Sequence, residues 1–175
     1  MRRLLLLRHA KSSWATPALA DHDRPLAPRG IRAVGTLRRH VAGQPIVPDV
    51  VLCSTARRTV ETWEGIAPAF PPDTRVDYAE DLYGATSAQL LRRLRQVAPP
   101  AECVLVIGHN PGIADLANRL AGSGELQLRR RLGAKFPTGA LATLLVAGRW
   151  TDLGWGTAEL ADYVVPRQLD PTDTT

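Results

Sequence analysis

Three uninterrupted apolar runs constrain the fold of this chain more than any other feature. They lie within residues 3–7, 49–53 and 103–107, and the last two are rich in β-branched side chains. A strand with one solvated face alternates apolar and polar residues, whereas a strand covered on both faces is continuously apolar. The runs therefore predict parallel strands buried between two layers of helices.

Helical periodicity fills the segments between these runs. Apolar residues share one helix face within residues 31–41, 60–70, 90–97 and 113–120, the first of these faces beginning at Ile31. Thr86 and Gln89 have capping-box spacing, and Asn110 followed by Pro111 predicts an N-cap and a first helical position. Segments 140–148 and 157–165 predict two weaker strands, as a hairpin or an edge pair.

Alternating strands and helices indicate an α/β fold: a three-layer, doubly wound, mostly parallel sheet with helices on both faces. A length of 175 residues favours one domain. We expect that domain to cover residues 1–165 and residues 166–175 to form a flexible tail.

The net charge of +5 fits an anionic partner (phosphate, nucleic acid or an acidic protein surface) as well as it fits a merely arginine-rich surface. Cys53 and Cys103 lie in apolar runs without ligand spacing, which predicts a reducing, cytoplasmic location. Arg8, His9 and Lys11 interrupt the N-terminal leucines too early for a signal peptide. No apolar run approaches membrane-spanning length, so we expect no membrane association.

Charged and imidazole side chains follow three of the predicted strands directly. Arg8 and His9 end the first, Ser54 to Arg58 follow the second at a helix start, and His109 follows the third at another. Ligands of open parallel sheets bind beyond the carboxyl ends of the strands. Arginine forks and helix N-termini bind phosphate, and neutral imidazole is a nucleophile toward phosphorus. The pattern predicts phosphoryl chemistry.

The segments "LLLLRHA", "STARRTVET" and "VLVIGHNPG" resemble the three signature segments of the histidine phosphatase superfamily, which has the phosphoglycerate mutase-like fold. "DHDRPLAPRG" and "KFPTGALATLLV" are similar to its SixA-like branch, the protein phosphohistidine phosphatases. The resemblance runs from about residue 3 to residue 147. It implies a metal-independent hydrolase without a cofactor that forms a phosphohistidine intermediate.

The resemblance also implies the roles of individual residues. His9 would be the nucleophile, and Arg8, Arg58 and His109 would hold the phosphoryl oxygens. Ser54 and Thr62 fix the register that selects Arg58 over Arg57. Arg24 resembles an arginine of the SixA-like branch that reaches the phosphate from a loop. Ala10 replaces the usual glycine of the Arg-His-Gly motif, which a backbone φ below zero would tolerate.

The sequence is compatible with two classes of substrate. One is phosphohistidine on a protein, such as a histidine-phosphotransfer domain, which needs no general acid because imidazole is a good leaving group. The other is a small phosphomonoester, with Glu80 as the general acid, since Glu80 stands three residues before Tyr83-Gly84 as in the larger relatives.

Two other classes of protein fit the sequence less well. A cysteine-dependent phosphatase needs five residues between nucleophile and arginine, a spacing that places Thr59 where the arginine should follow Cys53. A basic binding module with a degenerate site has only the net charge in its favour. Its basic runs lack interleaved aromatic residues, so no nucleic acid partner is expected. The oligomeric state is not indicated.

Overall fold

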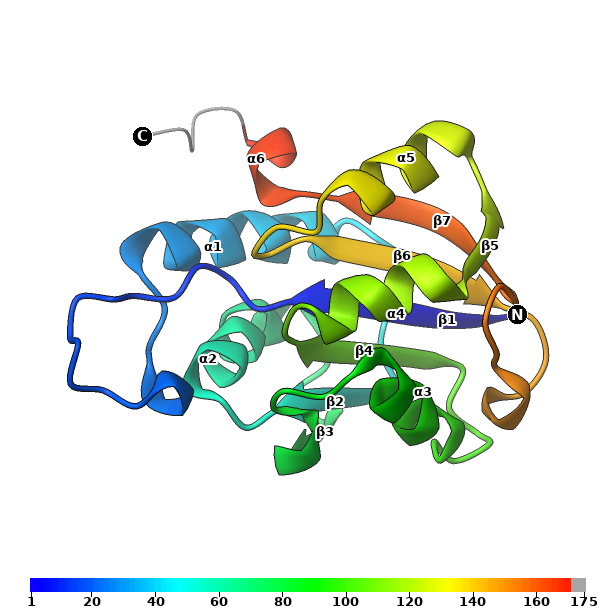
Figure 1. The fold of residues 1–175 in the computed structure, drawn as a ribbon, viewed down its shortest axis with the longest axis horizontal. Coiled ribbons are helices and arrows are strands. Elements are labelled where there is room, and N and C mark those ends of the chain that lie inside the picture. Colours follow the sequence, from blue (N-terminus) through cyan, green and yellow to red (C-terminus); the bar gives the residue numbers. More distant parts are fainter. Residues whose placement is uncertain (171–175) are drawn as a thin grey trace.

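The computed structural model describes residues 1–170, and its centre is one seven-stranded sheet (Figure 1). The strand order is β3-β2-β4-β1-β6-β7-β5, and β6 alone among these strands runs antiparallel to its neighbours. The strands are β1 (Arg2–Arg8), β2 (Val50–Ser54), β3 (Arg75–Ala79), β4 (Cys103–Gly108), β5 (Ala121–Gly124), β6 (Leu141–Val146) and β7 (Ala158–Val164). The predicted α/β class and mostly parallel sheet are confirmed.

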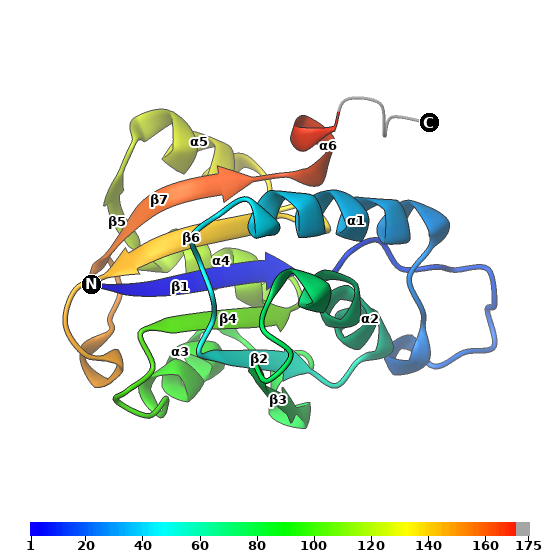
Figure 2. The ribbon, with the colours of Figure 1, turned by 180° about the vertical axis from the view of Figure 1, so that it is seen from behind.

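Helices cover both faces of the sheet, as the two opposite views show (Figures 1 and 2). They are α1 (Pro28–Ala42) and α2 (Arg57–Ile66) on one face, and α3 (Ser87–Arg95), α4 (Gly112–Leu120) and α5 (Leu126–Ala134) on the other, with the short α6 (Pro166–Leu169) beside α1. The predicted three-layer arrangement is therefore present.

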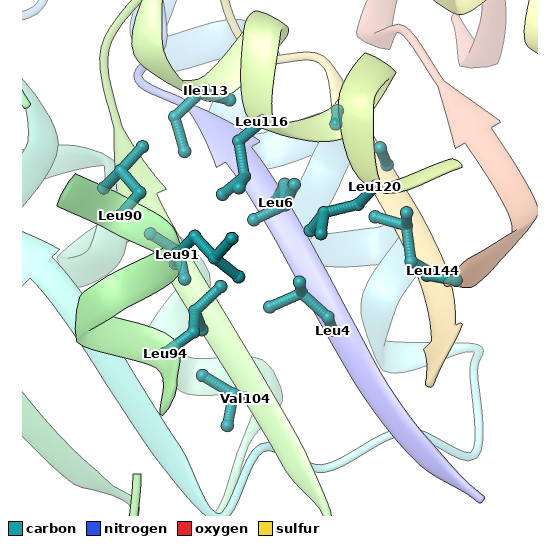
Figure 3. Packing of buried hydrophobic residues seen from close by; sticks show 14 of the residues in the cluster. Leu4, Leu6, Leu90, Leu91, Leu94, Val104, Ile113, Leu116, Leu120 and Leu144 are labelled. Carbon is teal, nitrogen blue, oxygen red and sulfur yellow. The ribbon is translucent and has the colours of Figure 1, made fainter. Parts of the chain in front are cut away.

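The leucines of β1 explain why a continuous apolar run marks this strand. Successive side chains of a strand point to opposite faces. Leu4 and Leu6 pack under α3 and α4, as Figure 3 shows, whereas Leu5 and Leu7 pack against the α1 and α2 side. The hydrophobic clusters on the two faces of the sheet thus both include side chains of β1. This packing fixes the position of the C-terminal end of β1.

The four helices predicted from periodicity are present, but α2 ends at Ile66 and not at residue 70. Two helix starts also differ from the sequence pattern. The capping box at Thr86 and Gln89 is present. Asn110 does not cap α4: its side-chain amide donates to the carbonyl of Phe136, and Pro111 takes the N-cap position. Ile31 is 62% exposed because Gly30 is the buried residue of the first turn of α1.

The hairpin of β6 and β7 exists, but it is no edge pair. β6 lies against β1 in the middle of the sheet, and β5 pairs outside β7. Before residue 166, the sequence pattern missed three elements: β3 at the other edge, β5 with the sequence AGSG, and the arginine-rich α5. None of them carries the periodic apolar signal of a buried element.

The C-terminal segment begins with structure where a tail was expected. Residues 166–169 form α6, Pro166 is buried, and Arg39 of α1 forms an ion pair with Asp170 at 3.4 Å. The remainder of the expected tail, residues 171–175, lies outside the described residues. Within residues 1–170 there is no helix of the length and apolarity needed to cross a membrane.

Candidate active site

The carboxyl ends of β1, β2 and β4 meet at one edge of the sheet. Arg8 lies opposite Gly108 in the parallel pair β1–β4, and Cys53 lies opposite Ile107 in the pair β2–β4. His9 and His109, which follow β1 and β4, and Ser54, the last residue of β2, therefore emerge side by side. The His9 and His109 ring centroids are 5.2 Å apart.

His9 is held with one ring nitrogen free for chemistry. Its side chain is buried, and its Nδ1–H donates to the carbonyl of Ala10 at 2.7 Å. A carbonyl only accepts, so the proton lies on Nδ1 and the lone pair lies on Nε2. Burial lowers the pKa of His9 to about 4, although the Ala10 hydrogen bond opposes that shift. His9 is a neutral imidazole near pH 7.

His109 is neutral as well and is fixed by two partners. Its Nε2–H donates to the Ser54 hydroxyl at 2.8 Å, and an Arg58 N–H lies 3.4 Å from Nδ1. Burial is the main cause that lowers the pKa of His109 to about 3, followed by His9 and Arg58. Two buried neutral imidazoles thus stand beside permanent cations.

Arg8 and Arg58 supply those cations. One terminal N–H of Arg8 donates to the carbonyl of Phe136 at 3.0 Å, while its Nε is buried with no hydrogen-bond partner within residues 1–170. Burial lowers the pKa of Arg8, and the charge of Arg58 lowers it further. A half-buried and a buried guanidinium group that repel each other, one with an unsatisfied donor, are suited to bind an anion.

Asp21 is the residue that sequence reasoning missed. Arg58 donates to its backbone carbonyl at 2.6 Å and to its carboxylate at 3.0 Å. Tyr83 O–H donates to the same carboxylate oxygen at 2.7 Å, and Arg24 binds the other oxygen at 3.1 Å. The Tyr83 hydrogen bond, ahead of Arg58, lowers the pKa of Asp21 to about 2. A carboxylate therefore occupies donors of the arginine expected to bind phosphate.

Arg24 is buried in the loop before α1, where its donors already have partners. They reach the Ser12 hydroxyl at 2.9 Å, the Ser13 carbonyl at 3.0 Å and Asp21, and the guanidinium carbon lies 3.1 Å from the centre of the Trp14 ring. These contacts fasten the loop across residues 12–24. Contact between Arg24 and phosphate stays a prediction.

Glu80 lies outside the hydrogen-bond network of this cluster. It begins the 3₁₀ turn Glu80–Leu82 and is exposed, and within residues 1–170 its carboxylate forms no hydrogen bond or ion pair. Tyr83, just after that turn, is the group that enters the site. The edge of its ring meets His109 at 5.5 Å and His22 at 5.0 Å between centroids.

Ala10 fits where the family motif has glycine. Its backbone N–H donates to the Thr62 hydroxyl at 3.0 Å, and that hydroxyl donates to the Arg58 carbonyl at 2.6 Å. No residue other than glycine has a positive φ within residues 1–170. Thr62 of α2 thereby connects the segment after β1 to the helix that carries Arg58.

Cys53 is unsuited to act as a nucleophile. It is fully buried in β2, and burial raises the pKa of its thiol to about 12, so no thiolate forms near neutral pH. Across residues 1–170, no group of three or more His, Cys, Asp or Glu side chains is arranged to hold a metal ion. An apolar hollow of about 270 Å³ between α1 and the sheet is lined by none of the four predicted site residues.

Comparison with known proteins agrees with the geometry. Residues 4–85 match the model of the histidine phosphatase superfamily, branch 1. The SixA protein of Nakamurella, named as a candidate phosphohistidine phosphatase, is 34% identical, with a TM-score of 0.82 over 94% of this chain and 96% of that chain. The chain belongs to the histidine phosphatase superfamily. It is a SixA-like phosphatase, and the site described above is the candidate active site of that hydrolase.

Two further relatives extend this similarity. A SixA protein of Agrobacterium tumefaciens, also named as a candidate phosphohistidine phosphatase, is 30% identical, with a TM-score of 0.80 over 94% of this chain and 98% of that chain. An uncharacterised protein of Mycobacterium tuberculosis is 41% identical over 165 residues, which cover 92% of this chain and all of the relative. The similarity therefore spans nearly the whole chain.

Proposed function

We propose that this phosphatase removes the phosphoryl group from phosphohistidine on a protein, through a phosphohistidine intermediate on His9. One observation carries the proposal: a buried, neutral His9 with its Nε2 lone pair free beside Arg8, Arg58 and His109. The names of the SixA neighbours support the class of substrate. We also propose a cytoplasmic location, which suits two buried free thiols.

In the first step, His9 Nε2 attacks phosphorus while the P–N bond of the substrate breaks. The leaving imidazole carries a proton on its second nitrogen, so it departs as a neutral base with the electron pair of the broken bond. Arg8 and Arg58 hold the phosphoryl oxygens, and the phosphoryl group takes the place of the Asp21 carboxylate on Arg58. The dianion raises the pKa of His109, which can then donate from Nδ1.

In the second step, water attacks the phosphorus of phospho-His9 and the P–Nε2 bond breaks. Nε2 recovers its lone pair, orthophosphate forms, and the proton of water leaves with the phosphate. The same donors stabilise both transition states, which is the usual source of most of the rate enhancement. Asp21 then returns to Arg58.

The leaving group favours phosphohistidine over a phosphomonoester. An alkoxide needs a general acid, and the two carboxyl groups considered do not supply one. Glu80 makes no contact that holds it in the site, and the pKa of Asp21 is about 2, so Asp21 is ionised. An imidazole leaving group needs neither.

The test is to trap the intermediate. Enzyme is mixed with a ³²P-phosphohistidine peptide, quenched in alkaline detergent, and separated from the peptide. We expect label on the protein that acid removes, as phosphohistidine chemistry requires, and we expect His9→Ala to carry no label and to release no phosphate.

The matched control is His40→Ala, a histidine of α1 outside the site, which should label like the wild type. Normal turnover by His9→Ala would refute the mechanism. Acid-stable label would place the phosphoryl group on a residue other than histidine. Activity on p-nitrophenyl phosphate but none on phosphohistidine peptides would refute the proposed substrate.

A further inference from the structure

A basic pocket opens beside the candidate active site, separate from the cluster around His9. It has a volume of about 130 Å³, and its charged lining residues are Lys11, Arg29, Lys135 and Arg167, which define the basic pocket below. These four come from the segment after β1, the start of α1, the end of α5 and α6. Figures 1 and 2 both show α6 beside α1, close to the connection between α5 and β6.

The four cations have no anionic partner in the described part of the chain. No acidic residue lines the pocket, and none of the four side chains forms an ion pair or a hydrogen bond within residues 1–170. Other arginines of the surface are paired, as in Arg57–Glu61 and Arg93–Asp77. Like charges gathered around one hollow repel each other, and a bound anion relieves that repulsion.

The backbone ties the basic pocket to the nucleophile. Lys11 follows His9 by two residues, and the carbonyl of Lys11 accepts a hydrogen bond from Ala27 at the start of α1 at 2.8 Å. Gly139, next to the pocket residue Thr138, donates to the carbonyls of Arg8 and His9 at 3.1 and 3.0 Å. The pocket and the end of β1 therefore form one rigid unit.

Gly30 shows how closely this unit is packed. A Cβ at Gly30 would lie 2.2 Å from the carbonyl oxygen of Lys11, so the helix that carries Arg29 touches the backbone beside His9 directly. The backbone positions of Lys11 and Arg29 are thus fixed relative to the end of β1, whereas the charged side chains of the pocket are exposed.

We infer that the basic pocket binds acidic residues of the substrate protein that flank its phosphohistidine, an inference that rests on the proposed function. Exposed lysine and arginine side chains, without a buried polar donor among them, suit carboxylates spread over a protein surface better than one small, tightly held anion. Such complementary charge selects partners and speeds their association.

The test uses two synthetic peptides, each with one histidine phosphorylated by phosphoramidate and flanked by either glutamate or glutamine. The wild-type enzyme should hydrolyse the glutamate peptide with about ten-fold higher kcat/KM, a preference that shrinks as salt screens the charges. The variant Arg29→Gln/Lys135→Gln/Arg167→Gln should lose that preference while its kcat on p-nitrophenyl phosphate stays within about two-fold of wild type.

A matched control removes the same three charges elsewhere. Arg38, Arg92 and Arg130 are exposed and lie outside the pocket, so the variant Arg38→Gln/Arg92→Gln/Arg130→Gln should keep the preference. If the control variant lost the preference for the glutamate peptide to the same extent, the net charge of the enzyme alone would cause that preference. This result would overturn the inference.

The remaining outcomes separate the inference from the proposed function. A wild type that hydrolyses both peptides equally well overturns the inference and leaves the proposed function standing. A wild type that hydrolyses neither overturns both. If the pocket variant kept the peptide preference, the inference would be wrong. Should tripolyphosphate inhibit the wild type but not that variant, the pocket would bind a small anion instead.

Discussion

At the scale of single residues, the site combines neutral bases with permanent cations. His9 and His109 lose their charge because they are buried beside arginines, whereas arginine stays protonated in proteins. Of these cations, Arg58 has a counter-charge in this structure, the Asp21 carboxylate at 3.0 Å. A bound phosphoryl group has to compete with that carboxylate.

Arg58→Ala should leave a folded protein with kcat on a phosphohistidine peptide lowered by about 10²–10³, the usual effect of removing one preorganised donor. Arg57→Ala is the matched control, because Arg57 is a neighbour that points to Glu61 on the surface. We expect its kcat to stay near wild type. Greater damage from Arg57→Ala would show that the register of the motif is wrong.

Asp21→Asn should strengthen inhibition by orthophosphate, with an inhibition constant several-fold lower than that of wild type. The substitution removes the negative charge that occupies Arg58 and keeps the size of the side chain. Because the pKa of Asp21 is about 2, the effect should be constant between pH 5 and 8. Asp23→Asn, in the same turn, serves as control. Weaker inhibition in Asp21→Asn would show that Asp21 does not compete with phosphate.

At the scale of elements, the segment after β1 and helix α2 are connected through one hydroxyl. Thr62 accepts from Ala10 and donates to the carbonyl of Arg58, so the positions of His9 and Arg58 depend on each other. Thr62 can contact the carbonyl of Arg58 because the two residues are one helical turn apart in α2.

Thr62→Val should cost about 1–3 kcal/mol of unfolding free energy, since it leaves the buried Ala10 N–H without an acceptor. It should also lower kcat, because the segment of His9 loses its connection to α2. Urea unfolding and peptide kinetics measure the two effects. Thr62→Ser keeps the hydroxyl and should retain most of the unfolding free energy and most of kcat. If Thr62→Ser lost as much of either as Thr62→Val, the effect would belong to the methyl group.

At the scale of the whole molecule, folding lowers the pKa of two histidines, His9 and His109. Their folded pKa values, about 4 and about 3, lie below the value of about 6.5 for an unfolded histidine. The unfolded chain therefore binds more protons than the folded one at acidic pH. The stability that these groups contribute is complete above about pH 6.5 and is lost as the pH falls toward the folded values.

The unfolding free energy should accordingly decrease between pH 6.5 and 4, by about 5 kcal/mol. Urea unfolding at a series of pH values measures it. The double variant His9→Gln/His109→Gln should show a flatter dependence, whereas His40→Gln should not change it. A dependence identical in the double variant would assign the acid sensitivity to other groups.

Sequence alone predicted the central parallel strands β1, β2 and β4 and most of the candidate site, because both are encoded locally. A continuous apolar run indicates a strand buried on both faces, and the residue after it lies at the carboxyl edge. Arg8, His9 and His109 could be placed by that rule, and the resemblance to the family spacing from Ser54 to Thr62 selected Arg58. The structure brings these four side chains together.

The remainder depended on tertiary contacts between segments far apart in the chain. Asp21 and Tyr83 meet across 62 residues, and nothing in either segment distinguishes Asp21 from Asp23 or Tyr83 from an exposed loop residue. The same holds for the basic pocket, whose four cations come from four elements. Local sequence patterns determine which strands and strand ends exist. Only the packing of loops and helices around those ends decides which charges lie next to His9, because that packing is set by contacts and not by periodicity.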